Sequence, residues 1–149
     1  MLVVKRIGRG VASHFPVRAS EWLMICPTFG MGLALMLQPA MFDTSPSFSV
    51  LSRWADEAIW STLAILCAVL RLVALVVNGT FARFPYSPHL RAFASFAGAG
   101  LWGQFTLAFT SAALAGGGSL SPVVAYSTFL LAEFLNIWRS FADLGRLSR

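Results

Sequence analysis

The sequence contains few charged residues. Only 11% of its 149 residues are Asp, Glu, Lys or Arg, whereas an ordinary soluble domain contains about 25%. This number of charges is too small to cover a water-facing surface, and 57% of the residues are hydrophobic. The composition therefore predicts an all-α integral membrane protein, with residues 1–149 forming a single membrane domain.

The sequence also lacks the residue clusters on which enzymes and metal sites depend. Its two cysteines, Cys26 and Cys67, lie in apolar segments and form no CxxC motif, which is typical of buried free thiols. Its two histidines, His14 and His89, lie outside the apolar segments, where they could not bind a haem inside a bundle. No GxSxG motif is present, and the sequence GAGLWG at residues 98–103 matches the GxGxxG spacing but follows no predicted strand, which indicates small-residue helix packing and not phosphate binding. We expect no enzyme activity, no cofactor and no metal.

Acidic residues are scarcer than basic ones, and the net charge is +5. In a soluble protein this excess would indicate nucleic-acid binding. Here the basic residues flank the apolar segments, so the enrichment of positive charge on the cytoplasmic side of membrane proteins explains them better. We therefore expect the lipid bilayer, and not a nucleic acid, to be the partner.

Four apolar segments reach the length of about 20 residues that a membrane-spanning helix needs. The first contains Pro27, Gly30 and Gly32, which predict a kink. A signal peptide is the weaker interpretation of this segment, because no clear cleavage site follows it. The predicted helices are residues 22–42, 58–77, 92–115 and 122–141.

The segments between these helices carry turn and capping signals. Residues 43–54 contain Pro46 and four serines, which predict an exposed loop. Asp56 and Glu57 suit the first turn of the second helix, and Asn78-Gly79 is typical of its C-terminal cap. The sequence GGGSLS ends the third helix, and Pro122 fits the first turn of the fourth.

The distribution of basic residues predicts the orientation of the helices. Basic residues are concentrated in segments 1–20, 78–91 and 139–149, whereas the two remaining loops carry only Arg53 and three acidic residues. Both termini and the middle loop are therefore predicted to be cytoplasmic. The basic segment 1–20 fits either an interfacial helix or a disordered tail. Aromatic residues near the predicted boundaries would form an interfacial belt: Trp22, Trp54, Trp60, Tyr86 and Trp138.

Two opposite charges lie inside the predicted spans. Arg71 is the only charge in the second helix and Glu133 the only charge in the fourth. A charge in hydrocarbon costs several kcal/mol unless it is paired or functional. Arg71 lies seven residues before Asn78 and Glu133 six before Arg139, so both lie about 10 Å from the same boundary. Equal depth on helices that run in the same direction predicts a salt bridge.

Further polar residues extend this pair into a predicted intramembrane cluster. Tyr126 and Asn136 share a face of the fourth helix with Glu133, and Gln104 is the polar centre of a small-residue face on the third helix. The predicted cluster consists of Arg71, Glu133, Gln104, Asn136 and Tyr126. An interhelical clamp is the favoured interpretation, because transport pathways usually carry more ionisable groups and paired repeats. The alternative is a proton or ion relay.

Three short segments resemble a known group of proteins: RLVALVVNG in the second helix, SPHLRA before the third, and LAEFLNIWR in the fourth. They are similar to small four-helix membrane proteins encoded in tailed-phage and prophage genomes. The resemblance implies a multi-pass protein of the bacterial inner membrane, but it transfers no function. The positions that match the polar pattern of that group are Arg71, Asn78, Arg91, Glu133, Asn136 and Arg139.

Three functions fit these observations. The first is a phage-type protein that modifies the host membrane, holin-like in the broad sense, for which small size and basic ends are typical. The second is a structural or accessory subunit that binds another membrane protein through small-residue faces. Besides the bilayer, the expected partner is such a membrane protein or further copies of the chain in a homo-oligomer. The third is a minimal transporter or channel that uses Arg71 and Glu133.

Overall fold

The fold is entirely helical in the part of the chain that the structure describes. The computed structural model describes residues 8, 12–81 and 84–147, and these contain no strand. Half of the predicted basic segment 1–20, with Lys5, Arg6 and Arg9, therefore lies outside the described residues. The α-helices are α2 (Ala19–Leu23), α3 (Ile25–Leu37), α4 (Met41–Thr44), α5 (Glu57–Thr80), α6 (Ser87–Leu114) and α7 (Ser121–Leu147), and two short 3-10 turns are η1 (Pro46–Phe48) and η2 (Leu51–Arg53).

The first predicted helix, residues 22–42, is divided into three pieces. Helix α2 ends at Leu23, four residues before Pro27, whose ring would collide with the Leu23 carbonyl in a continuous helix. Helix α3 ends at Leu37, because Gln38 precedes Pro39 and leaves the helical conformation with a φ of −125°. The predicted kink thus lies at the junction of α2 and α3.

The longer helices lie at the predicted positions with different bounds: α5 and α7 end three and six residues later than predicted, and α6 begins five residues earlier. The Asp56 carboxylate accepts a hydrogen bond of 2.9 Å from the backbone nitrogen of Ile59 and so caps α5. Asn78-Gly79 does not end this helix, which continues to Thr80; the Asn78 side chain instead accepts a hydrogen bond of 2.7 Å from Ser87. Helix α6 begins at Ser87, so Arg91 lies within a helix and not in a loop.

The predicted end of the third helix is confirmed. After Ala115, Gly116 has a φ of +79°, a left-handed conformation that glycine adopts without strain. Gly116 donates its backbone hydrogen bond to Ala113 and Gly117 donates to Ala112. This is the Schellman arrangement, which satisfies two of the free carbonyls at the end of α6.

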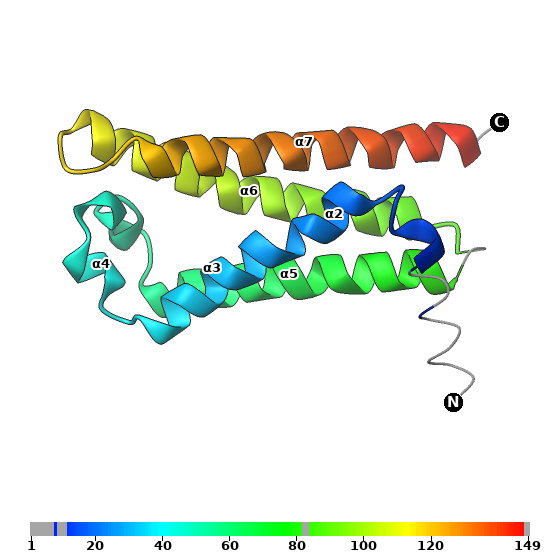
Figure 1. Cartoon of the computed structure of the whole chain (residues 1–149), viewed down its shortest axis with the longest axis horizontal. Coiled ribbons are helices and arrows are strands. Elements are labelled where there is room, and N and C mark those ends of the chain that lie inside the picture. Colours follow the sequence, from blue (N-terminus) through cyan, green and yellow to red (C-terminus); the bar gives the residue numbers. More distant parts are fainter. Residues whose placement is uncertain (1–7, 9–11, 82–83, 148–149) are drawn as a thin grey trace.

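The helices form an elongated bundle (Figure 1). Helix α5 packs against α3 and α6, α6 packs against α7, and α2 contacts both α5 and α7. Both ends of the described chain and the α5–α6 connection lie at one end of the bundle, here called the terminal end. The α6–α7 turn and the segment with α4 lie at the other end, the loop end. The predicted grouping of the two termini with the middle loop therefore matches the arrangement of the helices.

The segment between α3 and α5 folds against the bundle. We predicted an exposed loop for residues 43–54, but Phe48 and Leu51 are buried, as is the preceding Phe42. The Phe48 ring stacks on Phe42 at 5.0 Å and contacts Phe109 edge-on at 4.8 Å between ring centroids. The Glu57 carboxylate accepts a hydrogen bond of 2.9 Å from the backbone nitrogen of Phe42. These buried aromatic rings therefore pack across the loop end of the bundle and hold the segment against it.

Aromatic rings also fill the bundle behind this segment. Trp102 is fully buried and packs against Phe105, Tyr126 and Phe129. The prediction that Trp60 belongs to an interfacial belt is wrong, because Trp60 is buried and its ring contacts Phe105 edge-on. Its indole nitrogen donates to the Leu51 carbonyl at 3.3 Å, so the ring joins the core to the folded loop.

By length and composition, two helical segments of the described chain could cross a membrane: Ala19–Leu37 and Glu57–Thr80. Helices α6 and α7 are long enough but do not meet the same measure of mean hydropathy. Gln104 and several glycines and serines lower the hydropathy of α6, and Glu133 and Asn136 lower that of α7. The four predicted spans therefore stay a prediction.

Candidate functional site

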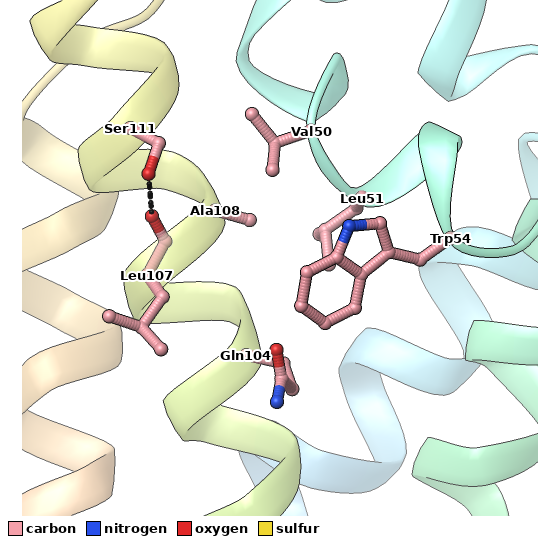
Figure 2. Close-up of a pocket in the computed structure, with 7 residues that line it drawn as sticks. All are labelled: Val50, Leu51, Trp54, Gln104, Leu107, Ala108 and Ser111. Atoms are coloured by element: carbon pink, nitrogen blue, oxygen red, sulfur yellow. Dashed lines mark hydrogen bonds between the residues drawn. The ribbon is translucent and has the colours of Figure 1, made fainter.

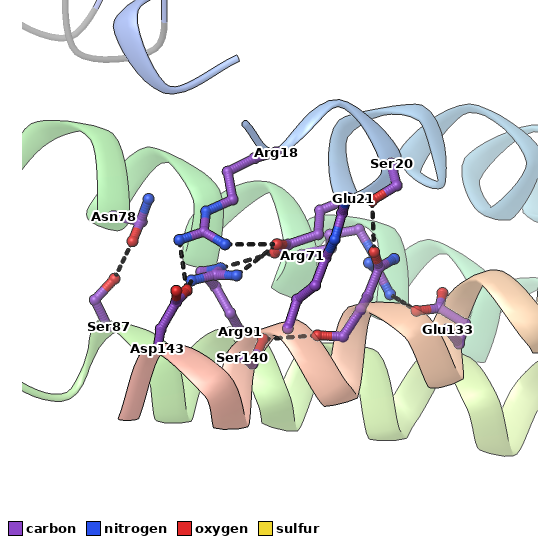
Figure 3. Close-up of polar contacts among 12 residues, drawn as sticks. Arg18, Ser20, Glu21, Arg71, Asn78, Ser87, Arg91, Glu133, Ser140 and Asp143 are labelled. Carbon is purple, nitrogen blue, oxygen red and sulfur yellow. Dashed lines mark hydrogen bonds and ion pairs between the residues drawn. The ribbon is translucent and has the colours of Figure 1, made fainter. Parts of the chain in front are cut away.

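The most polar part of the interior is a network of buried charges in the terminal half of the bundle (Figure 3). Four of its side chains are at most 3% exposed. They come from α2, α5, α6 and α7, so the network joins all of these helices. We call this set the ion-pair network, and its members are Arg18, Glu21, Arg71, Arg91, Glu133 and Asp143.

The deepest pair of the network joins α5 to α7. Arg71 donates through Nη2 to Oε2 of Glu133, and the same nitrogen lies 3.4 Å from the Ala94 carbonyl of α6. The predicted Arg71–Glu133 salt bridge is thus present. Glu133 is fully buried, and the attraction between buried opposite charges is strong because water does not screen it.

Gly98 of α6 makes room for this pair. A methyl group on Gly98 would lie 2.7 Å from Cδ of Glu133 and 2.9 Å from Nη2 of Arg71. Real side-chain carbons do not approach so closely, so only glycine lets α6 pack directly over the charges.

Replacing Gly98 by alanine should therefore lower the free energy of unfolding by about 1–3 kcal/mol, because the methyl group displaces the ion pair. Gly30→Ala on α3 is the matched control, since a methyl group there meets nothing within 4 Å. Denaturant unfolding in detergent micelles measures both variants. If the Gly98→Ala variant were as stable as the Gly30→Ala variant, α6 would not pack directly over the Arg71–Glu133 pair at this position.

A second group of charges lies nearer the terminal end. Arg91 donates to both carboxylate oxygens of Glu21, through Nε at 2.8 Å and Nη2 at 2.6 Å. It also donates through Nη1 to Oδ2 of Asp143 at 2.8 Å, and Arg18 binds the same oxygen. The bidentate contact between Arg91 and Glu21 has the geometry that a guanidinium group favours with a carboxylate. Arg91 therefore fastens α2 and α7 to α6.

Neutral side chains connect α2 to α7 between these two groups of charges. Ser20 donates to Oδ1 of Asn136 at 2.7 Å, and Arg139 donates to the Ser20 hydroxyl at 3.0 Å. Asn136 and Ser140 are fully buried. Asn136 and Arg139, on consecutive turns of α7, thus bind Ser20 of α2. On the next turn, Asp143 binds Arg18 at the N-cap of α2.

Asp143 titrates under the influence of both arginines. It lies beyond the predicted fourth span, residues 122–141. Partial burial raises the pKa of its carboxyl group, but the hydrogen bonds and charges of Arg91 and Arg18 outweigh burial, so the pKa is below its ordinary value of 3.8. The stabilisation is therefore complete above pH 3.8 and is lost as the pH falls through the lowered pKa.

The Asp143→Asn variant should accordingly be less stable than the unmodified chain at neutral pH, and the difference should shrink as the pH falls below 3.8. Asp43→Asn is the control, because Asp43 is exposed and forms no ion pair with a described residue. Unfolding midpoints between pH 7 and pH 2 give the comparison. A constant difference across this range would argue against the arginine contacts of Asp143.

The structure brings together three of the five residues of the predicted cluster: Arg71, Glu133 and Asn136. Tyr126 lies elsewhere, in the aromatic core against Trp102 and Phe109. Gln104 also lies apart from the charges, beside Trp54 in a surface cavity (Figure 2). Sequence reasoning did not identify Glu21 and Asp143, because both lie just outside the predicted spans. The spacing of Arg18 and Glu21, one helical turn apart, was a usable signal.

The arrangement of these charged side chains fits a structural role better than a role in proton transfer or metal binding. The three carboxylates of the network all face arginine, and an arginine side chain does not release its proton in proteins. Within the described residues, no group of three His, Cys, Asp or Glu side chains could hold a metal ion. The network is best understood as a set of links between helices.

No protein-family model matches the chain, and no curated protein or solved structure matches it either.

Proposed function

We propose that the chain is a four-span protein of the bacterial inner membrane that serves as a structural or accessory subunit and binds another membrane protein. One observation carries this proposal: four ionisable side chains are buried inside the bundle, whereas many large apolar side chains are exposed on the outer faces of its long helices. Glu21, Arg71, Arg91 and Glu133 are at most 3% exposed. A protein that folds in water has the opposite distribution.

The exposed apolar side chains follow the full length of the long helices. They include Leu63, Leu66, Val69 and Val73 on α5, Phe93, Phe96 and Leu107 on α6, and Leu131, Phe134, Leu135 and Phe141 on α7. Contiguous apolar surface of this extent is rare on soluble monomers and marks a membrane or protein contact. It supports membrane insertion of α6 and α7, although their mean hydropathy is lower than that of α5.

The ends of the bundle fit the same proposal. Trp54 at the loop end and Tyr86 at the terminal end are both more than 60% exposed, as expected of aromatic residues at the two membrane interfaces. Among the described residues, Arg18 and Arg91 lie towards the terminal end (Figure 3) and Arg53 lies in η2 towards the loop end. The terminal end would then face the cytoplasm.

The ion-pair network supports a rigid scaffold in preference to a transport pathway. Its charges neutralise one another and link the helices. Towards the loop end, the interior beside Trp102 is filled by the rings of Phe105, Phe109 and Tyr126. A transporter would need a polar route through this region, and packed aromatic rings offer none.

A holin-like role is the second candidate, favoured by the apolar outer faces of α5, α6 and α7, which could support extensive self-association. The resemblance to phage-encoded proteins belongs to the same hypothesis. It requires the bundles to assemble into lesions, whereas an accessory subunit leaves the membrane intact.

Induced expression in a bacterium separates the two candidates. The accessory-subunit proposal predicts membrane insertion, resistant to extraction by alkaline carbonate, with normal membrane potential and growth. Abrupt depolarisation after a delay, together with a fall in culture density, would favour the holin-like role. Recovery of the chain in the soluble fraction would contradict both.

A further inference from the structure

A groove runs along α6 on the outside of the bundle. It consists of two adjoining cavities, of about 280 and 420 Å³. The first is lined by Trp54 and Ser111, the second by Cys67 and Gly100, and Gln104 lines both. From Ala97 to Ser111 the groove extends over about 21 Å of the helix. We call it the Gln104 groove.

Gln104 is the unusual residue of this groove. No described residue forms a hydrogen bond with its carboxamide, which lies below the Trp54 ring in Figure 2. Thr106, Thr110 and Ser111, by contrast, each donate to a carbonyl four residues earlier in α6. Gln104 lies about 15 Å from the C-terminal end of α6. In a bilayer this depth offers no water to pair with the amide.

The rest of the groove suits another helix. Ala97, Gly100 and Ala108 present small side chains, and a methyl group on Gly100 would meet nothing within 4 Å. Such positions let a second helix approach closely. A lipid acyl chain could also fill the apolar walls, but it would leave the carboxamide without a partner.

The geometry points to a second copy of this chain as the occupant, and this inference rests on the proposed membrane insertion. We propose that two copies pack groove to groove and that their Gln104 carboxamides form reciprocal hydrogen bonds. Copies inserted with one orientation are related by a two-fold axis along the membrane normal, which brings residues of equal depth together. A carboxamide carries both a donor and an acceptor, so it is complementary to itself.

Single-molecule photobleaching of the full chain, with one fluorophore per copy, in vesicles of bacterial phospholipids would test this dimer. The unmodified chain should be dimeric at low lipid dilution. Gln104→Leu should weaken dimerisation by about 3- to 30-fold, the range expected for a hydrogen bond between membrane helices. Gly100→Leu should weaken it as well, because the side chain fills the groove. Thr128→Leu, on the exposed surface of α7, should leave it unchanged.

Folding is measured separately, by the thermal unfolding midpoint at high lipid dilution. Because Gln104 makes no hydrogen bond within the described chain, Gln104→Leu should leave the monomer as stable as before. A chain that is monomeric at every dilution would overturn the proposal and assign the groove to lipid. A dimer insensitive to Gln104→Leu and Gly100→Leu would overturn it too, whereas a chain that does not enter vesicles would refute the membrane proposal itself.

Discussion

Replacing either Arg71 or Glu133 by alanine should lower the free energy of unfolding by about 3–5 kcal/mol, because each change leaves a buried charge without its partner. The double variant should recover much of this loss, since it removes both charges. Arg71 and Glu133 are 3% and 0% exposed, so water cannot solvate the charge that remains. Titration with SDS in mixed micelles, followed by circular dichroism, measures all four chains.

The double-mutant cycle separates pairing from simple loss of packing. If the two charges stabilise each other, the effects of the single changes will not add. Asp43→Ala serves as the control, because it removes an exposed carboxylate outside the network. Additive effects of Arg71→Ala and Glu133→Ala would contradict direct pairing.

Replacing Arg91 by alanine should be at least as damaging, with an expected loss of about 3–5 kcal/mol. The change removes the bidentate contact to Glu21 and one of the two arginine contacts to Asp143. Arg91→Lys should restore only part of the stability, because one ammonium group cannot reproduce the planar fork of the guanidinium. The same unfolding titration measures both variants.

Arg139 provides the matched control for Arg91. It lies on α7, is partly exposed and makes one described side-chain hydrogen bond, to Ser20. Arg139→Ala should therefore cost only about 1 kcal/mol. If Arg91→Ala and Arg139→Ala lowered the free energy of unfolding equally, the contacts of Arg91 with Glu21 and Asp143 would contribute no more stability than the single hydrogen bond of Arg139.

The sequence allowed the central pair to be predicted because depth along a helix can be counted. Arg71 and Glu133 are each the only charge in an apolar segment, and their distances from the segment ends match. The same counting fails for side-chain direction. Gln104 lies six residues beyond Gly98, which faces Glu133. Six residues rotate the helix by about 600°, which is one full turn plus about 240°. Its side chain therefore points away from the charges, into the Gln104 groove.

Distance along the helix accounts for Tyr126. It shares a face with Glu133, but seven residues separate them by about 10 Å, which places Tyr126 among the aromatic rings. Glu21 and Asp143 were missed for another reason. Charges at the ends of apolar segments are usually solvated, and only the contact of α2 with α6 and α7 buries Glu21 beside Arg91.

Cysteine labelling of whole cells would test the central claim, a bundle that spans the membrane with its terminal end in the cytoplasm. Single cysteines replace Ser52, Ser119 or His89, all exposed, in a chain whose Cys26 and Cys67 are changed to alanine. With the outer membrane permeabilised, an impermeant maleimide should label positions 52 and 119 at once and position 89 only after lysis. Labelling of position 89 in intact cells at the same rate as positions 52 and 119 would contradict this topology.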